Sequence, residues 1–375
     1  LGVLLIIISE PEYFKIIENR TWNTFFVSSQ IILGILFSLY FFSHRKIKNK
    51  VSLYLIILDI WILAVTIIRQ GAVYAAFSKL YILFILVLIY EYFESDKKTM
   101  VGIFMWCMEL LIYTGLADVI IHPSGITEGQ WILGGQNDII RYLLPAYCLA
   151  VLYDRIYRNR IRAVALICAI NYIAVVINSS TTIVGILIMD VALLIKCTRK
   201  IIDLRIALIM TVIAFGLVVV SQNIFISSII TDFFGKSITF HGRTPIWQYV
   251  TGEIIRHPFI GNGRGNFQIS SWYVASHTHC FILEIAYRSG IIGIILLFLA
   301  IRAIIIKMEK NRESILYPLL SAALFSFFVM GIVEVHEYHL MYLIFLIAYD
   351  IQDFTNLVVR KSNVQTISEC HSSYI

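Results

Sequence analysis

Long apolar runs separated by short polar segments make up the chain from its first residue to about residue 351. About 20 consecutive apolar residues form a helix that crosses the ~30 Å hydrocarbon core of a membrane. Eleven runs approach that length, and a shorter apolar run, residues 1–8, precedes them. The runs cover residues 24–43, 51–68, 72–93, 99–116, 139–153, 161–178, 180–195, 205–221, 279–301, 315–333 and 338–351. The pattern predicts an all-α polytopic membrane protein with about 11–12 transmembrane helices.

The two ends of the chain differ from these runs. Residues 1–8 show no basic segment or cleavage site, so we interpret them as the outer end of a further span and not as a signal peptide. Residues 352–375 are polar and lack a helical period, which predicts a disordered cytoplasmic tail. We therefore expect one transmembrane domain, residues 1–351, followed by this tail.

One long polar interval, residues 222–276, interrupts the apolar runs before the last three predicted spans. Within it, Thr244-Pro245 followed by apolar residues at helical spacing predicts an amphipathic helix over residues 245–256, lying on the outer membrane surface. The interval and the start of the next span also gather cationic and imidazole side chains: His241, Arg243, Arg256, His257, Arg264, His277, His279 and Arg288. We expect the functional site here.

Composition agrees with a membrane protein and excludes a soluble one. Apolar residues make up 59% of the chain and charged residues 14%, against roughly 45–50% and ~25% in soluble domains. The net charge of +6 does not point to nucleic acid, because basic residues are expected in the cytoplasmic loops of any such protein. We expect the lipid bilayer, and no nucleic acid, as a partner.

The distribution of basic residues predicts the orientation. Alternate loops and the tail hold 20 of the 30 lysines and arginines, in residues 44–50, 95–98, 154–162, 196–205, 302–314 and after residue 351. The positive-inside rule places this set in the cytoplasm. The interval 222–276 is then outside the cell membrane, where its chemistry meets extracytoplasmic substrates.

Three motifs in this region resemble a known family. They are HGR-x3-W at residues 241–247, HPFIGNGRGNF at 257–267 and SHTHCFILEIAYRSGIIG at 276–293. In their order, and in their place before the last three spans, they resemble the O-antigen ligase and O-antigen/capsule polymerase (Wzy-type) superfamily. By position, Arg243 matches the loop arginine of that family and His279 its helix-start histidine. Many members carry Ser-Arg where this chain has Ser179 followed by Ser180, so Arg141 or Arg69 would have to replace that arginine.

The resemblance implies glycosyl transfer from a polyprenyl-diphosphate-linked oligosaccharide on the outer face of a bacterial inner membrane. It implies no nucleotide sugar, no cofactor and no metal ion. It also implies that a chain-length regulator and a flippase act in the same pathway. Polymerase and ligase differ in the acceptor, which is another lipid-linked repeat unit or a lipid A core. We favour the polymerase because an Ile-, Asn-, Lys- and Tyr-rich composition suggests an AT-rich bacterium without lipopolysaccharide.

The chemistry of such a transfer assigns roles to the residues. A leaving diphosphate needs its charge stabilised, which arginine does bidentately, so we predict that Arg243 and Arg264 bind the diphosphate. The acceptor hydroxyl needs a base, for which a histidine near neutral pH is suited. We predict His279 for that role, with His277 as second choice. If one helix includes both histidines, they face opposite sides, so one should matter far more.

The sequence GNGRGN at residues 261–266 follows no strand and does not fit a dinucleotide fingerprint. A glycine-rich turn outside the membrane can instead present backbone N–H groups to an anion. We therefore include Gly261, Gly263 and Gly265 with Arg264 and Arg256 in the predicted diphosphate site. The alternative is a turn that merely leads the chain back into the membrane.

Other ionisable residues receive weaker assignments. Glu284 and Arg288 are four residues apart on a predicted span and should pair, either orienting His279 or only neutralising each other. Glu10 and Glu12 are the only hint of a metal-dependent glycosyltransferase, and we expect no metal site. The competing class is a transporter such as a lipid-linked-oligosaccharide flippase, although the internal repeat common in transporters is not evident.

Overall fold

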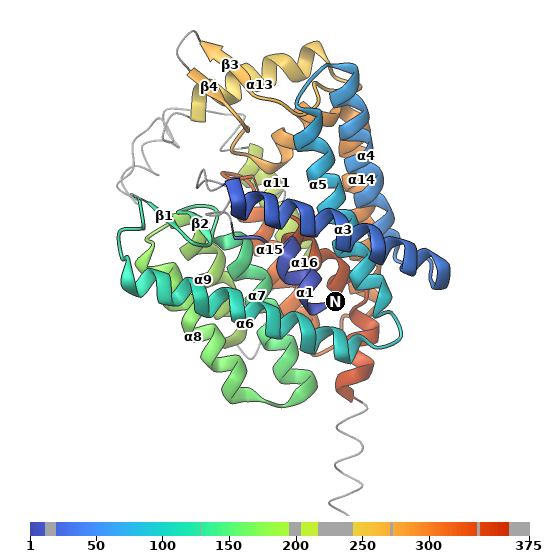
Figure 1. Cartoon of the computed structure of the whole chain (residues 1–375), viewed down its shortest axis with the longest axis vertical. Coiled ribbons are helices and arrows are strands. Elements are labelled where there is room, and N and C mark those ends of the chain that lie inside the picture. The colour runs from blue at the N-terminus through green and yellow to red at the C-terminus, as the bar shows by residue number, and fades with distance from the viewer. Residues whose placement is uncertain are drawn as a thin grey trace, which may run out of the picture.

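The computed structural model describes residues 1–11, 20–127, 129–194, 204–216, 243–270, 273–335 and 338–359. These residues form a bundle of helices with two small antiparallel hairpins (Figure 1). The helices are α1 (Gly2–Ile8), α3 (Arg20–His44), α4 (Lys50–Ile68), α5 (Val73–Tyr92), α6 (Lys97–Ile121), α7 (Ile140–Tyr157), α8 (Arg160–Val176), α9 (Ser180–Leu194), α11 (Leu204–Phe215), α13 (Arg243–Arg256), α14 (Phe281–Lys310), α15 (Tyr317–Met330) and α16 (His339–Tyr349). The hairpins are β1 (Gln130–Trp131) with β2 (Gly134–Gly135), and β3 (Phe267–Ser270) with β4 (Tyr273–Ala275).

Each of the eleven predicted spans coincides with one of these helices. Among the described residues, five helical segments are long and apolar enough to cross a membrane, and a sixth is formed by the bent pair His339–Tyr349 and Ile351–Val359. Three more apolar helices, α9, α11 and α15, are shorter. The prediction of an all-α polytopic membrane protein is therefore confirmed.

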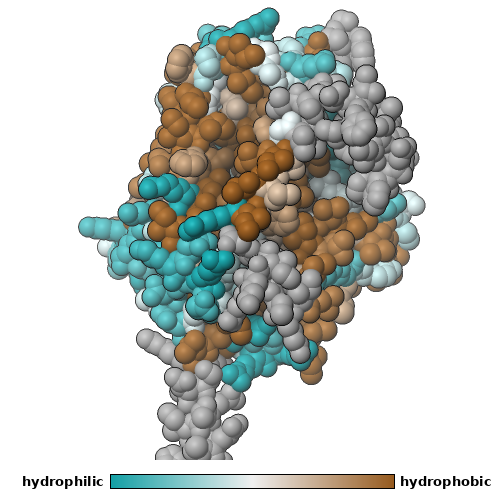
Figure 2. Space-filling model, turned by 180° about the vertical axis from the view of Figure 1, so that it is seen from behind, coloured by the Kyte–Doolittle hydropathy of each residue, from teal (hydrophilic) through white to brown (hydrophobic). Residues whose placement is uncertain are grey.

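The exterior and the centre of the bundle differ as a membrane requires. α3 exposes a stripe of large apolar side chains, among them Ile32, Leu36 and Leu39, as expected of a helix that faces lipid. α16 is buried along its whole length, as expected of a helix that is apolar on every side. Figure 2 shows broad apolar surface on the back of the molecule, with hydrophilic residues gathered at the top and towards the bottom.

The candidate site lies at the end of the bundle where the predicted outer ends of the helices meet. α14 packs against α4 and α13, and α16 packs against α7 and α14. In Figure 1, α13, β3 and β4 form the top of the molecule, and the last described helix, in red, reaches towards the bottom. The predicted cytoplasmic and outer loops thus fall at opposite ends.

Two predictions about local structure need correction. The amphipathic helix begins at Arg243, and its face formed by Ile246, Trp247 and Val250 is buried against protein, so it does not simply lie on the membrane surface. Residues 351–359 form a helix after a bend of 66°, with Phe354 fully buried. This part of the predicted tail is ordered because it still has an apolar face to bury. His241, Glu12 and residues 360–375 lie outside the described residues.

Candidate active site

α13 presents Arg243 at its first residue. The helix is held in place by its buried apolar face, which packs against Phe267 of β3 and against the start of α14. In addition, the indole Nε1 of Trp247 donates a hydrogen bond of 2.9 Å to the carbonyl oxygen of Thr278. This bond connects α13 directly to the segment 276–280, which carries both candidate histidines.

The same segment is fixed from the other side by α14. Glu284 accepts a hydrogen bond of 2.8 Å from the backbone N–H of Thr278 and forms an ion pair with Arg288. Arg288 in turn donates to the carbonyl oxygen of Ser276 at 3.4 Å. The predicted i,i+4 pair is therefore confirmed, and it does more than neutralise two charges. It orients the backbone on both sides of His277.

Glu334 joins the candidate residues into one cluster. Its Oε1 lies 3.3 Å from Nδ1 of His279 and 3.6 Å from Nε2 of His277, and its Oε2 lies 3.1 Å from Nη2 of Arg243. Glu334 is 3% exposed, while the two histidines are 29% and 33% exposed. We call these four residues the Glu334 cluster. A buried carboxylate holds three cationic or imidazole groups that solvent can still reach.

Glu334 lies in the turn after α15 and was missed by the sequence analysis. Its position 55 residues after His279 leaves no local spacing that would connect the two. The available signal was an acidic residue in the short predicted outer loop EVHEYH, residues 334–339. A carboxylate there, facing an interval rich in histidine and arginine, could have been proposed as their counter-charge.

The backbone at His279 explains why both histidines reach Glu334. α14 begins only at Phe281, so His277 and His279 precede it, and the condition under which a helix would turn them apart is not met. His279 has φ of +52°, a left-handed conformation that is uncommon for residues other than glycine. With this bend the two imidazole rings lie 4.1 Å apart, centroid to centroid. Such strain is typical of functional sites.

The charges in the cluster are strongly coupled. Burial alone would raise the pKa of Glu334, but the nearby imidazoles of His277 and His279 and the positive charge of Arg243 hold this pKa well below its usual range. Burial lowers the pKa of Arg243, while Glu334 opposes that shift, and an arginine stays protonated in either case. The cluster therefore contains a permanent ion pair with two imidazoles beside it.

The cluster also resembles a metal-binding set. One ligand atom each from His277, His279 and Glu334 lie within 4.8 Å of one another, and two imidazoles with a carboxylate are a known zinc combination. The Arg243 guanidinium, however, already occupies the other oxygen of Glu334. A fixed positive charge at that distance opposes the binding of a further cation.

Most backbone amides of the glycine turn, residues 257–265, donate to acceptors within the protein. The N–H of Gly261 donates to the carbonyl of His257 at 3.1 Å, and that of Gly263 donates to the carbonyl of Arg288 at 3.0 Å. The N–H of Arg264 donates to Oγ1 of Thr66 at 2.8 Å. The predicted anion-binding role of Gly261 and Gly263 is therefore wrong, because these amides are used within the protein.

The glycines serve close packing between α4 and α14. Gly261 has φ of +79°, and a Cβ there would lie 2.6 Å from the backbone nitrogen of Ser289. Gly263 has φ of +74°, and its Cβ would lie 2.6 Å from Cα of Thr66. Gly265, by contrast, has room, since its nearest neighbour would be 3.9 Å away. Gly261 and Gly263 are thus required for the close contact of the turn with α14 and α4.

The remaining predicted arginines lie in different places. Arg69 donates to the carbonyl of Gly261 at 3.3 Å and lies 3.0 Å from Nδ1 of His257, so it secures the glycine turn. Arg256 is 74% exposed and pairs with Glu253. Arg264 is buried and lines a cavity beside Asp59, whereas Arg243 contacts Glu334. Arg264 and Arg243 therefore have different surroundings, and their joint binding of a diphosphate stays a prediction.

Of the two candidates for the missing family arginine, Arg141 is the better placed. It stands in the first turn of α7, pairs with Asp138 at 2.6 Å, and donates to the carbonyl of Val335 at 3.3 Å. Val335 follows Glu334 directly. Arg141 thus contacts the turn that carries the cluster, from a helix outside the interval 222–276.

The bundle and the Glu334 cluster together define a multi-pass membrane protein with a candidate active site at one end. Residues 163–298 match the family model for O-antigen ligase, a range that includes Arg243, His277 and His279. This segment is therefore similar to the O-antigen ligase family, in agreement with the motifs. No curated protein and no solved structure shows significant similarity to the chain.

Proposed function

We propose that the protein is a polysaccharide polymerase, which transfers a glycan from polyprenyl diphosphate to a hydroxyl of an acceptor glycan. The observation that carries this proposal is the convergence of Arg243, His277 and His279 on Glu334. The first three lie in the O-antigen ligase segment and reach the carboxylate from two different elements. A clamp for a leaving diphosphate and a base for a hydroxyl then stand side by side.

In the proposed reaction, the acceptor oxygen bonds to the anomeric carbon while the bond from that carbon to the diphosphate oxygen breaks. The leaving electron pair stays on the diphosphate, whose charge Arg243 stabilises through its planar guanidinium. The acceptor proton passes to His279. Glu334 supports both steps, because it fixes the arginine fork and stabilises the imidazolium that forms.

The contacts of the two histidines favour His279 as the base. Nδ1 of His279 faces Glu334, which assigns its proton to that side and leaves Nε2 as the basic nitrogen. His277 instead turns Nε2 towards Glu334 and holds Oγ of Ser276 with Nδ1, at 2.9 Å. Both of its ring nitrogens are therefore engaged, which suits a supporting role.

Chain extension by purified protein tests the proposal. The full-length protein in detergent is supplied with polyprenyl-diphosphate-linked repeat units, and product lengths are read by gel and mass spectrometry. A polymerase yields a ladder of longer lipid-linked glycans. A ligase yields product only when a lipid A core is added. A flippase yields none, because detergent provides no membrane to cross, and that result would contradict the proposal.

The proposed orientation places the Glu334 cluster on the outer face of the bacterial inner membrane and the C-terminus in the cytoplasm. Cysteines introduced at Arg256, which is 74% exposed, and at the exposed Glu313 test it. On intact cells a membrane-impermeant thiol reagent should label Arg256→Cys and spare Glu313→Cys. The opposite pattern would reverse the orientation.

A further inference from the structure

A cavity of about 340 Å³ is lined by residues outside the Glu334 cluster. Its walls come from five parts of the chain: the segment after α1, α3, α4 with α5, the glycine turn, and the start of α16. The side chains that line it include Glu10, Gln30, Asp59, Tyr74, Lys79, Arg264, Tyr338, His339 and Tyr342. The volume is at the lower end of the range for ligand pockets.

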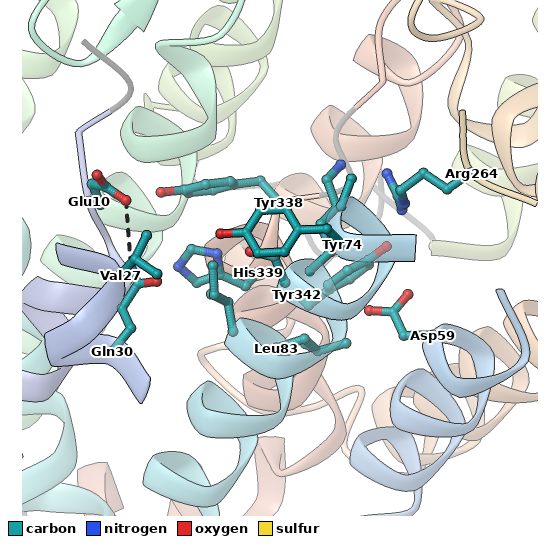
Figure 3. A pocket seen from close by; sticks show the side chains of 14 residues that line it. Glu10, Val27, Gln30, Asp59, Tyr74, Leu83, Arg264, Tyr338, His339 and Tyr342 are labelled. Atoms are coloured by element: carbon teal, nitrogen blue, oxygen red, sulfur yellow. Dashed lines mark hydrogen bonds between the residues drawn. The ribbon is translucent and has the colours of Figure 1, made fainter. Parts of the chain in front are cut away.

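The cavity has polar ends and aromatic walls (Figure 3). Glu10 and Gln30 stand at one end, joined by a hydrogen bond of 3.4 Å, and Asp59 and Arg264 stand at the other. Tyrosine rings and His339 lie between them. Flat rings that also carry a polar tip favour ligands that are apolar on one face and hydrogen-bonding at the edge.

The charges of the cavity argue against a diphosphate as its occupant. Glu10 and Asp59 contribute two carboxylates, and Lys79 and Arg264 two cations, so the lining is nearly balanced. Carboxylates accept hydrogen bonds from hydroxyl groups but repel a polyanion. An uncharged, hydroxyl-rich ring meets both the carboxylates and the aromatic walls favourably.

Helix α7 contacts both a wall of the cavity and the turn that carries Glu334. Arg141 donates to the carbonyl of Val335 at 3.3 Å, and Val335 follows Glu334 directly. Tyr338 donates to the hydroxyl of Tyr142 at 2.9 Å, and Tyr142 donates to the carbonyl of Glu10 at 3.0 Å. This chain of bonds holds the wall in place. Two adjacent residues of α7, Arg141 and Tyr142, thus connect the turn that carries Glu334 with the cavity wall.

We propose that this cavity binds an uncharged sugar unit of the glycan, while the diphosphate stays with Arg243. The inference rests on the proposed function and names a second subsite for it. Asp59 and Tyr342 act as specificity-determining residues, one by accepting hydroxyl hydrogen bonds and the other by aromatic contact and its hydroxyl group.

Direct binding tests this without requiring turnover. The probes are the repeat-unit oligosaccharide, released from the host's own lipid carrier by mild acid, and inorganic diphosphate. Calorimetry on the full-length protein in detergent should show glycan binding weakened about tenfold or more, roughly 1.4 kcal/mol, by Asp59→Asn and by Tyr342→Phe. Diphosphate binding should be unchanged in both. Tyr153→Phe is the matched control, since this tyrosine bonds Arg162 on α8, and it should bind glycan normally.

Unchanged glycan binding in both cavity variants, or loss of diphosphate binding instead, overturns the proposal even if the enzyme polymerises normally. Conversely, a protein that binds glycan through this cavity but never extends it keeps the subsite and loses the proposed polymerase activity. In turnover, a raised KM for the free acceptor assigns the sugar to the acceptor, and a raised KM for the lipid-linked donor assigns it to the donor. Either shift supports a sugar subsite.

Discussion

The Glu334 cluster and the glycine turn belong to the same stretch of sequence motifs, yet they differ in what they leave exposed. In the turn, the amides of Gly261, Gly263 and Arg264 are consumed by protein acceptors. In the cluster, the buried carboxylate of Glu334 contacts two histidines that remain about 30% exposed. The glycine turn therefore serves packing between helices, whereas the Glu334 cluster is the candidate site. Proximity in a motif therefore does not assign function; the direction in which each polar group points does.

Substitutions of Arg243 should cause the largest loss of activity. Both Arg243→Ala and Arg243→Lys should lower chain extension by about 10³-fold or more, since a point charge cannot replace the planar fork on a diphosphate. Product lengths from equal amounts of purified protein measure this. Near-normal output from Arg243→Lys would show that charge alone suffices.

His279→Ala should reduce extension by about 10²–10⁴-fold, while binding of inorganic diphosphate persists. His277→Ala should cost about tenfold at most, because His277 only supports Glu334. The pair is measured in the same extension assay, with thermal unfolding to confirm that both variants fold. Equal losses in the two variants would remove the distinction drawn from their ring nitrogens.

Glu334→Gln should lower activity by about 10–100-fold and change the dependence of stability on pH. The pKa of Glu334 is lowered in the folded protein, so its contribution to stability is full above the unfolded pKa, ~4.3, and is lost as pH falls through the folded value. The difference in thermal midpoint between wild type and variant should stay constant from pH 8 to 5 and shrink below about pH 4. A difference that shrinks already between pH 7 and 5 would contradict an ionised Glu334.

Gly261→Ala should lower the stability of the folded protein and should not alter the reacting groups. Its positive φ and the close approach to Ser289 predict a loss of about 1–3 kcal/mol in stability. Gly252→Ala is the matched control, because it lies in α13 with open space around it and should stabilise the helix by about 0.5–1 kcal/mol. Thermal unfolding in detergent compares them. An unfolding midpoint unchanged by Gly261→Ala would show that the turn and α14 can move apart to accept a Cβ atom.

Chelation should have the smallest effect. Because Arg243 already neutralises Glu334, treatment with EDTA followed by desalting should leave extension within about twofold of the untreated rate. Loss of activity that added Zn²⁺ restores would instead assign His277, His279 and Glu334 as metal ligands.

The sequence predicted the helices well because the membrane imposes a length and a composition that can be read residue by residue. It also predicted the Glu284–Arg288 pair, which depends only on helical spacing. It could not predict Glu334, since that contact joins elements 55 and 91 residues apart. Nor could it predict that the amides of Gly261 and Gly263 bond within the protein, because these bonds depend on how the turn packs against α14.

The long separation between Arg243 and Glu334 has a consequence for the biogenesis of the enzyme. The carboxylate that organises the site follows α15 in the chain, so the ribosome delivers it after α13 and the start of α14. Until then Arg243 and the two histidines lack their common partner. Under the proposed function, the nascent protein is therefore expected to stay inactive until α15 and the turn with Glu334 have been made, and chains that stop before Glu334 should lack activity.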